Sequence, residues 1–343
     1  MSGTDAVLAQ FMADGVARSR SFDLGYQELW ANLDRAAQGG KRFRPALVTA
    51  VYRAFGGRDD ELVAQVGAAV ELLHTAFVIH DDVSDGDDTR RGRLNVSGAF
   101  TERALSDGAV PARAAALGRT AGILAGDLAL VGATRTIALC GAAPSTTRRL
   151  LDLFDHAVYV TAAGELADVS LSVGSTSVSL GAVLIMEEHK TSVYSFELPL
   201  QSGAVLAGAP DTMVQRLSQL GRLLGIAFQL VDDIQGVFGD ESTTGKSTLT
   251  DLREGKVTPL IAHARSTRAW PRIAPFVGDA ELTEDRAAVA RDLLVECGSR
   301  SFIENLADGY VHASRELAAD LGLPHDFISS VWAMTDTVSR RAA

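Results

Sequence analysis

Residues 61–85, ELVAQVGAAVELLHTAFVIHDDVSD, decide the fold of this chain. Apolar residues recur along the stretch at spacings of three and four, which is the period of an α-helix and not of a strand. One stripe of such a helix carries the apolar residues Leu62, Val66, Val70, Leu73 and Phe77. His74, Asp81 and Asp85 fall on an adjoining stripe. The pattern therefore predicts one long helix with a core-facing side and a polar side suited to a site.

The same helical period governs nearly every other long segment, and strand signals are scarce. It covers roughly residues 43–55, 113–140, 147–171, 184–206, 213–238, 285–296 and 302–321. On the 213–238 segment the expected core positions are Val214, Leu217, Leu220, Leu224 and Val231. No break between segments is long and rich in Gly, Ser or Pro, as a flexible linker would be. We therefore predict an all-α fold class and a single domain over residues 1–343.

Composition bounds the function. With 343 residues, 47% of them hydrophobic and 22% charged, the chain is typical of a folded globular protein. A formal net charge of −11 argues against nucleic acid as a partner, because a phosphate backbone requires a basic face. Cys140 and Cys297 form no metal or disulfide motif, the N-terminal stretch does not resemble a secretory signal, and no uninterrupted apolar stretch reaches bilayer length. We expect a cytoplasmic protein without stable membrane insertion.

The first motif with chemistry is acidic. Asp81 and Asp85 lie one turn apart on the predicted helix, so their carboxylates can converge on a hard cation such as Mg²⁺. Arg90 and Arg91 follow within a few residues and supply donors suited to phosphate. The alternative is an ordinary solvated acidic face. The apolar run directly before the cluster favours the metal site over that alternative.

A second acidic pair, Asp232 and Asp233, lies in the otherwise apolar 213–238 segment. Burying two carboxylates without partners costs several kcal/mol per charge, so a cation is the economical explanation. Two such sites could hold one diphosphate through shared ions.

Basic residues form the third set. They are Lys41 and Arg44 beside a glycine pair, Lys190 before Thr191, and Lys246 and Lys256 after the second acidic pair. Each alone is more typical of a surface charge, and only the combination indicates a phosphate site. Residues 239–247 resemble a P-loop, but five residues separate the glycines where that motif has four, and no strand precedes it.

Four stretches of the chain occur in the order seen in trans-polyprenyl diphosphate synthases. They are GGKRFRPAL (39–47), ELLHTAFVIHDDVSDGDDTRRG (71–92), HKTSVYSFELPL (189–200) and FQLVDDIQGVFGDESTTGKSTLTDLREGK (228–256). The resemblance, closest to geranylgeranyl diphosphate synthases, implies an isoprenoid synthase-type bundle of antiparallel helices around a deep central cavity. It also implies a homodimer and about three Mg²⁺ ions with substrate bound.

The resemblance assigns roles to the matching positions. The metal ligands it implies are Asp81, Asp85 and Asp232, supported by Asp82 and Asp233. The contacts to an allylic diphosphate are Arg90, Lys190, Thr191, Gln229, Lys246 and Lys256. The contacts to isopentenyl diphosphate are Lys41, Arg44, His74 and Arg91. Among these, Asp81, Asp82, Asp85, Arg90, Lys190, Asp232 and Lys246 are the residues expected to act in catalysis.

These residue types suit one reaction. Metal ions and basic side chains stabilise the charge on the departing diphosphate, an allylic cation forms, and the isopentenyl double bond attacks it. The proton then passes to the released diphosphate. A class I terpene cyclase would not need the second basic set, and a non-catalytic prenyltransferase subunit would typically lack the acidic motifs.

Product length depends on residues just before the first acidic motif. Phe77 lies one turn before Asp81, where its ring could form the floor of the product cavity, and Ala76 beside it is small. Phe77 could equally be an ordinary core residue. In the family that the chain resembles, aromatic residues at these positions restrict elongation. The resemblance therefore implies geranylgeranyl diphosphate as the product, with farnesyl diphosphate or a C25 to C30 product as alternatives. Two departures from the family pattern are Gly236, where many members have Asp, and Leu94, where proline is usual.

Overall fold

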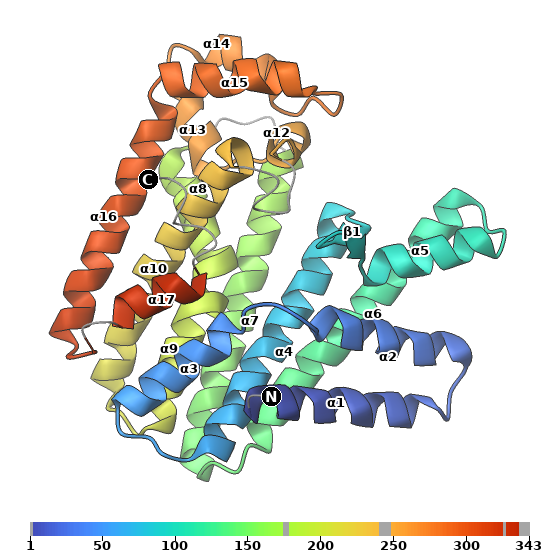
Figure 1. Ribbon diagram of the computed structural model, residues 1–343, viewed down its shortest axis with the longest axis vertical. Coiled ribbons are helices and arrows are strands. Elements are labelled where there is room, and N and C mark those ends of the chain that lie inside the picture. Colours follow the sequence, from blue (N-terminus) through green and yellow to red (C-terminus); the bar gives the residue numbers. More distant parts are fainter. Residues whose placement is uncertain (1–2, 174–177, 240–247, 325–326, 336–343) are drawn as a thin grey trace. The chain divides into compact units, whose positions relative to one another are not determined.

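The computed structural model describes residues 3–173, 178–239, 248–324 and 327–335, and these residues are almost entirely helical (Figure 1). The long helices are α1 (Gly3–Ser19), α2 (Leu24–Ala37), α3 (Phe43–Ala54), α4 (Asp60–Asp85), α5 (Val96–Ser106), α6 (Pro111–Ala138), α7 (Pro144–Val173), α10 (Asp211–Phe238), α15 (Glu284–Glu296) and α16 (Ser299–Asp320). Shorter helices are α8 (Leu180–Glu187), α9 (Leu198–Leu206), α12 (Thr250–Glu254), α13 (Pro259–Arg265), α14 (Trp270–Ile273), the 3₁₀ turn η2 (Ala274–Phe276) and α17 (Phe327–Thr335). The predicted all-α fold class is confirmed.

Several findings differ from the sequence expectation. Helices α1, α2 and α5 lie outside the predicted helical segments. The segment predicted as a continuous α-helix over 184–206 contains a π-helical stretch, η1 (Glu188–Glu197), between α8 and α9. Two short strands, β1 (Thr89–Arg90) and β2 (Arg93–Leu94), form an antiparallel hairpin that the sequence did not predict. Neither feature has a periodic signature, because a π-bulge and a two-residue hairpin are local events without a repeating apolar pattern.

The chain forms two compact units. The first comprises Met1–Asp155 and Pro199–Asp211, and the second comprises His156–Leu198 and Thr212–Ala343. The single domain predicted for residues 1–343 stays a prediction.

Helix α4 is the centre of the first unit, where α1, α3 and α6 pack against it. Its predicted apolar stripe is confirmed at Val66, Val70 and Leu73, which are fully buried. Asp59 caps the start of α4 by accepting a hydrogen bond from the N–H of Leu62 at 2.9 Å. The buried residues of α6 are nearly all Ala and Gly, so side chains of α4 lie close to the α6 backbone. A Cβ built on Gly126, for example, would stand 2.2 Å from the ring of His80.

In the second unit the core joins α10 to the C-terminal helices. The predicted core positions Val214, Leu217, Leu220 and Leu224 are buried, whereas Val231 is only partly buried. Helix α13 packs against α16 and α8, and α15 packs against α16. Helix α10 thereby fixes the acidic pair near its C-terminal end to a rigid core.

Two helices, α4 and α6, are long and apolar enough by composition to cross a membrane, although polar residues interrupt both. The most apolar part of α4 is 72% buried inside the protein and that of α6 is 39% buried. Core helices of folded proteins share these properties, so the two helices carry no conclusion about a membrane.

Candidate active site

The acidic end of α4 is shaped by its C-terminal glycine. Gly86 adopts a left-handed conformation with φ of 74°, and its N–H donates a hydrogen bond to the carbonyl oxygen of Asp82. The helix therefore ends just after Asp81, Asp82 and Asp85, with no basic residue in its last turn. The C-terminus of a helix carries partial negative charge, which disfavours carboxylates unless a cation compensates them. A positively charged group close to these carboxylates would therefore stabilise the end of the helix.

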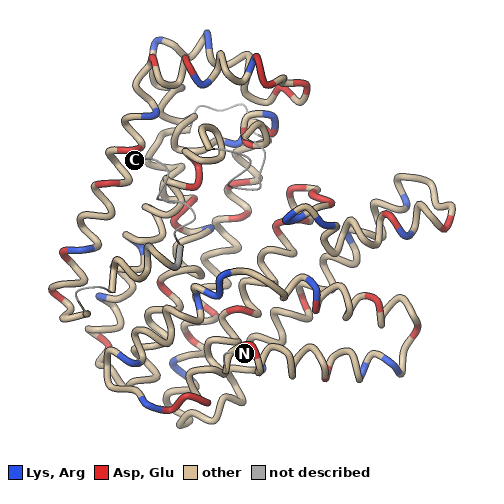
Figure 2. The backbone as a smooth tube through the Cα atoms, in the orientation of Figure 1, with Lys and Arg blue, Asp and Glu red and all other residues tan. Residues whose placement is uncertain are grey.

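Arg90 supplies part of that charge. The β1–β2 hairpin pairs Arg90 with Arg93 across a two-residue turn in which Arg91 and Gly92 both have positive φ, as a type I′ turn requires. This turn brings the Arg90 guanidinium to 2.6 Å from the Oδ1 of Asp82 and 3.2 Å from the Oδ2 of Asp81. Figure 2 shows acidic and basic segments adjoining where α4 meets the hairpin.

Asp82 differs from its neighbours because it is buried. Burial raises the pKa of the Asp82 carboxyl to about 6, although the hydrogen bond and charge of Arg90 act in the opposite direction. A buried carboxylate with a raised pKa gains most from a bound cation. Leu94, where proline is usual in the family, lies in β2 and pairs with Thr89 of β1, so the hairpin forms with leucine at this position.

Basic side chains gather around His74, which lies about two helical turns before Asp81 on α4. Its Nδ1 atom is buried, and burial lowers the pKa of the imidazole well below its ordinary value. The charges of Arg44, Arg91, Arg90 and Arg42 act in the same direction. A neutral imidazole beside four guanidinium groups marks a local positive field in an acidic protein.

Two glycines make room for one of these arginines. Gly39 and Gly40 both have φ of 78°, and a Cβ on Gly39 would stand 3.2 Å from the Nη1 of Arg91. The Arg44 guanidinium lies 4.3 Å from the ring centre of Phe43 and is almost completely buried. The predicted isopentenyl set of Lys41, Arg44, His74 and Arg91 therefore lies within the first unit, together with Ala76, Phe77 and the first acidic motif.

The second unit holds the other predicted residues. Asp233 on α10 is buried and accepts a hydrogen bond from the Nε2 of Gln229 at 2.9 Å. Glu187, at the end of α8, is also buried, and each of these two carboxyls has one oxygen without a hydrogen-bond partner among the described residues. Burial raises the pKa of Asp233 to about 7 and raises that of Glu187 well above its ordinary value. The carboxyls of Asp233 and Glu187 can share one proton, which reduces the repulsion between their charges.

Sequence reasoning missed Glu187, as well as the carboxylates that surround Lys190. The Lys190 ammonium lies 2.6 Å from the Oδ2 of Asp168 and 3.1 Å from the Oε2 of Glu165, both on α7. A Cβ on Gly164 would stand 2.3 Å from the backbone nitrogen of Lys190, so α7 and η1 meet backbone to backbone. The spacing of Glu165 and Asp168, three residues apart on one helix face, was the available signal.

The remaining residues of the second unit explain the other departure from the family pattern. A Cβ on Gly236 would stand 2.1 Å from the Oδ2 of Asp251, so the carboxylate of Asp251 fills the space beside this position. Lys256 lies 3.3 Å from the Oε2 of Glu254, and Thr191 belongs to η1. Lys246 lies outside the described residues.

The donor sets fit magnesium. Mg²⁺ usually takes one or two carboxylates and completes its shell with water and substrate phosphates. Among the residues that the structure describes, no three His, Cys, Asp or Glu side chains stand together as a preformed metal cage. Asp81 and Asp85 in the first unit and Asp232 in the second are carboxylates of the kind that bind Mg²⁺. Glu187 and Asp233 add two further buried carboxyls in the second unit.

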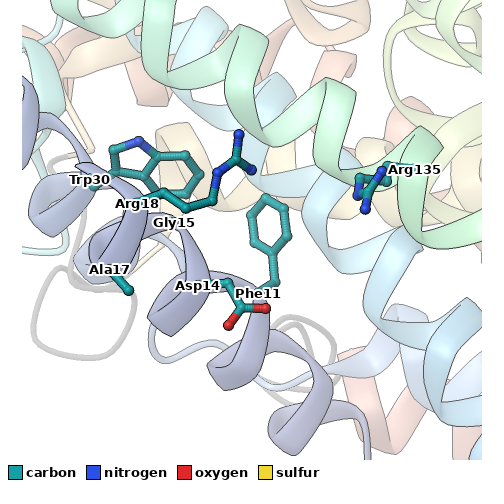
Figure 3. Close-up of a pocket in the computed structure, with 7 residues that line it drawn as sticks. All are labelled: Phe11, Asp14, Gly15, Ala17, Arg18, Trp30 and Arg135. Atoms are coloured by element: carbon teal, nitrogen blue, oxygen red, sulfur yellow. The ribbon is translucent and has the colours of Figure 1, made fainter. Parts of the chain in front are cut away.

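A separate cavity of about 340 Å³ lies between α1, α2 and α6, within the first unit (Figure 3). Its lining comprises Phe11, Asp14, Gly15, Ala17, Arg18, Trp30 and Arg135. None of these is a predicted site residue.

Comparison with known proteins identifies the class. The family model for polyprenyl synthetase matches residues 27–273. The geranylgeranyl diphosphate synthase of Methanosarcina mazei is 33% identical over 81% of this chain and 79% of its own length. That of Mycobacterium tuberculosis is 32% identical over 92% of this chain and 85% of its own. The fold and the two acidic helices thus define an all-α enzyme acting on diphosphates.

A solved structure agrees over nearly the whole length. The crystal structure of geranylgeranyl pyrophosphate synthase from Corynebacterium glutamicum, complexed with isoprenyl diphosphate and magnesium, superposes with a TM-score of 0.87 over 99% of both chains, at 26% identity. The chain belongs to the polyprenyl synthetase family. It is a chain-elongating trans-prenyltransferase.

Proposed function

We propose that this enzyme condenses isopentenyl diphosphate with an allylic diphosphate, in the presence of Mg²⁺, to give all-E geranylgeranyl diphosphate. The observation that carries the proposal is that α4 holds both the acidic helix end, Asp81 to Asp85, and His74, around which arginines from α3 and the β1–β2 hairpin gather. Carboxylates suit the metal and guanidinium groups suit the diphosphate. Relatives named as farnesyl and geranylfarnesyl diphosphate synthases supply the alternative product lengths.

The residues divide between two diphosphates in this proposal. Lys41, Arg44 and Arg91 bind isopentenyl diphosphate, and neutral His74 donates a hydrogen bond to it without adding charge. The allylic diphosphate is bound by Arg90, Lys190, Thr191, Gln229, Lys246 and Lys256. Glu165 and Asp168 hold the Lys190 ammonium in place for that contact.

Asp81, Asp85 and Asp232 would hold the Mg²⁺ ions, about three with substrate bound, while Asp82 and Asp233 support them. When bound, these ions neutralise the charge that develops on the departing diphosphate. The basic side chains around the same group lower the cost of that charge and keep the two substrates aligned.

Product length rests on Phe77. It lies four residues before Asp81 on α4 and is partly buried, beside the fully buried Ala76. A ring at this position would stop the growing chain about one helical turn below the acidic motif. Phe77→Ala should therefore shift the product beyond geranylgeranyl diphosphate.

We also propose a homodimer, on the basis of apolar stripes that the chain leaves exposed. On α6 the stripe comprises Leu117, Leu124 and Val131, seven residues apart, with Ile123 beside it, and each of them is about half exposed or more. On α7, Tyr159, Leu166 and Val173 repeat the same spacing and are exposed. A seven-residue repeat of apolar side chains is the pattern by which helices of two copies pack.

The test is direct. The purified protein is incubated with Mg²⁺, radiolabelled isopentenyl diphosphate and, separately, dimethylallyl, geranyl or farnesyl diphosphate, and the dephosphorylated products are separated by chromatography. We expect a C20 alcohol, a loss of at least about 100-fold in Asp81→Ala, and no loss in Asp292→Ala, an exposed acid on α15. Absence of elongation from every primer would favour a cyclase or a non-catalytic subunit instead.

A further inference from the structure

The segment that leads into α3 holds an unusual backbone. Arg42 is the residue before α3 and has a left-handed conformation, with φ of 54° and ψ of 31°. For a residue with a Cβ this conformation costs on the order of 1 kcal/mol, and Gly39 and Gly40 nearby share positive φ. The segment 39–44 therefore needs contacts that hold it in this shape.

The Arg42 side chain supplies those contacts. Its Nη1 donates to the Oε1 of Glu71 on α4 at 2.6 Å, and its Nε donates to the Oδ1 of Asp5 on α1 at 3.2 Å. Its Nη2 donates to the carbonyl of Ala37, at the end of α2, at 2.8 Å. One guanidinium thus ties the segment to three helices of the first unit.

The tie to Glu71 is the one best shielded from water, whereas the Asp5 side chain is 35% exposed. The Glu71 side chain is only 7% exposed and that of Arg42 is 23% exposed. Two carboxylates already neutralise Arg42, so it is poorly suited to bind a further anion. Lys41 and Arg91 differ, because neither makes an ion pair with any residue that the structure describes.

We propose that Arg42 is a positioning residue for isopentenyl diphosphate: its contacts with Glu71 and Asp5 fix the backbone between Lys41 and Arg44 so that both reach the diphosphate. The inference rests on the proposed function, which assigns Lys41 and Arg44 to that substrate. Glu71 lies one turn before His74 on α4, so the same contact fixes the segment to the helix that carries the acidic motif. Arg42 itself touches no substrate.

The test separates the two substrates. Arg42→Gly relaxes the left-handed backbone but removes all three ties, whereas Arg42→Lys keeps the charge and loses the planar fork. Steady-state assays with Mg²⁺ give KM for isopentenyl diphosphate and for the allylic diphosphate, and thermal unfolding reports stability. We expect Arg42→Gly to raise the KM for isopentenyl diphosphate by about tenfold, with an intermediate rise for Arg42→Lys. The KM for the allylic diphosphate should change by less than about twofold. Arg58→Gly, an exposed change in the α3–α4 connection, is the matched control.

Glu71→Gln distinguishes positioning from direct contact. If Arg42 positions the segment, loss of the Glu71 charge weakens isopentenyl diphosphate binding, and Arg42→Gly combined with Glu71→Gln is no worse than Arg42→Gly alone. If Arg42 instead binds the diphosphate, removal of a nearby negative charge tightens binding, which would overturn the proposal. An equal rise of both KM values, or a lowered unfolding temperature with unchanged KM values, would also overturn it. A wild-type protein that elongates no primer would instead contradict the proposed function.

Discussion

Three carboxylates at the end of α4 are unfavourable for the stability of the helix but suit the proposed metal site. Asp81, Asp82 and Asp85 gather in a last turn without a basic residue, where the helix dipole opposes negative charge. Carboxylates at this end of a helix oppose the dipole even where Arg90 pairs with Asp81 and Asp82, which is typical of groups retained for binding rather than for folding.

Asp85→Asn tests that conflict. Removing one carboxylate should raise the free energy of unfolding of the metal-free chain by about 0.3–1 kcal/mol, because the dipole no longer opposes a charge. The affinity for Mg²⁺ should fall by roughly tenfold or more if Asp85 is the metal ligand we propose. Denaturant unfolding with and without Mg²⁺ measures both effects. A variant less stable than wild type without Mg²⁺ would show that Asp85 supports the fold.

Glu197 gives a pH dependence away from the predicted ligands. It lies at the end of η1, is buried, and accepts a hydrogen bond from Ser218. Burial raises the pKa of its carboxyl, although the Ser218 hydrogen bond acts in the opposite direction. The folded chain thus holds a proton that the unfolded chain releases. This stability is complete below the unfolded pKa and is lost as pH rises through the folded pKa.

Glu197→Gln should remove that dependence. The variant should unfold at a higher temperature than wild type at about pH 8, and the difference should shrink towards about pH 5. Thermal unfolding followed by circular dichroism across this range measures it. Glu281→Gln, on an exposed side chain, should keep the wild-type profile. A pH-independent difference between Glu197→Gln and wild type would show that the substitution acts through packing.

At the scale of elements, the contact between α7 and η1 has no room for adjustment. Gly164 meets the backbone of His189 and Lys190, and backbone cannot rotate away as a side chain can. Lys190 belongs to the π-helical stretch η1 and lies against α7, and π-bulges often occur at functional sites. Lys190, the predicted contact to the allylic diphosphate, can thus lie in this position only because Gly164 has no side chain.

Gly164→Ala should destabilise the protein by about 1–3 kcal/mol through overpacking and should raise the KM for the allylic diphosphate. Gly309→Ala is the matched control, because a Cβ there meets nothing within 4 Å on helix α16. The control should gain about 0.5–1 kcal/mol from helix propensity. Urea unfolding of both variants measures the contrast. Equal stabilities would mean that α7 and η1 separate readily.

At the scale of the whole molecule, the exposed apolar stripe on α6 predicts the oligomeric state. Leu124→Glu places a charge in the middle of the proposed interface, so it should convert a dimer into monomers at micromolar concentration. Val295→Glu changes an equally exposed apolar residue on α15 and should leave the dimer unchanged. Sedimentation velocity distinguishes the species. A wild-type monomer, or a dimer unaffected by Leu124→Glu, would contradict the proposed interface.

The sequence by itself determined the long helices α3, α4, α6, α7, α10, α15 and α16, the two acidic pairs and the basic segment before α3. These features follow from near neighbours: apolar residues three and four apart specify a helix, and carboxylates one turn apart share a face. Val66, Val70 and Leu73 are buried as that period predicts. The family resemblance came from four such local motifs in order.

Only the tertiary structure decided which charges meet. Arg42 pairs with residues 29 and 37 positions away, Lys190 pairs with Asp168 across two helices, and Glu187 meets Asp233. The type I′ turn that brings Arg90 to Asp82 likewise left no period in the sequence. Such pairings depend on how helices pack, and packing is a property of summed contacts far apart in the chain rather than of any local pattern.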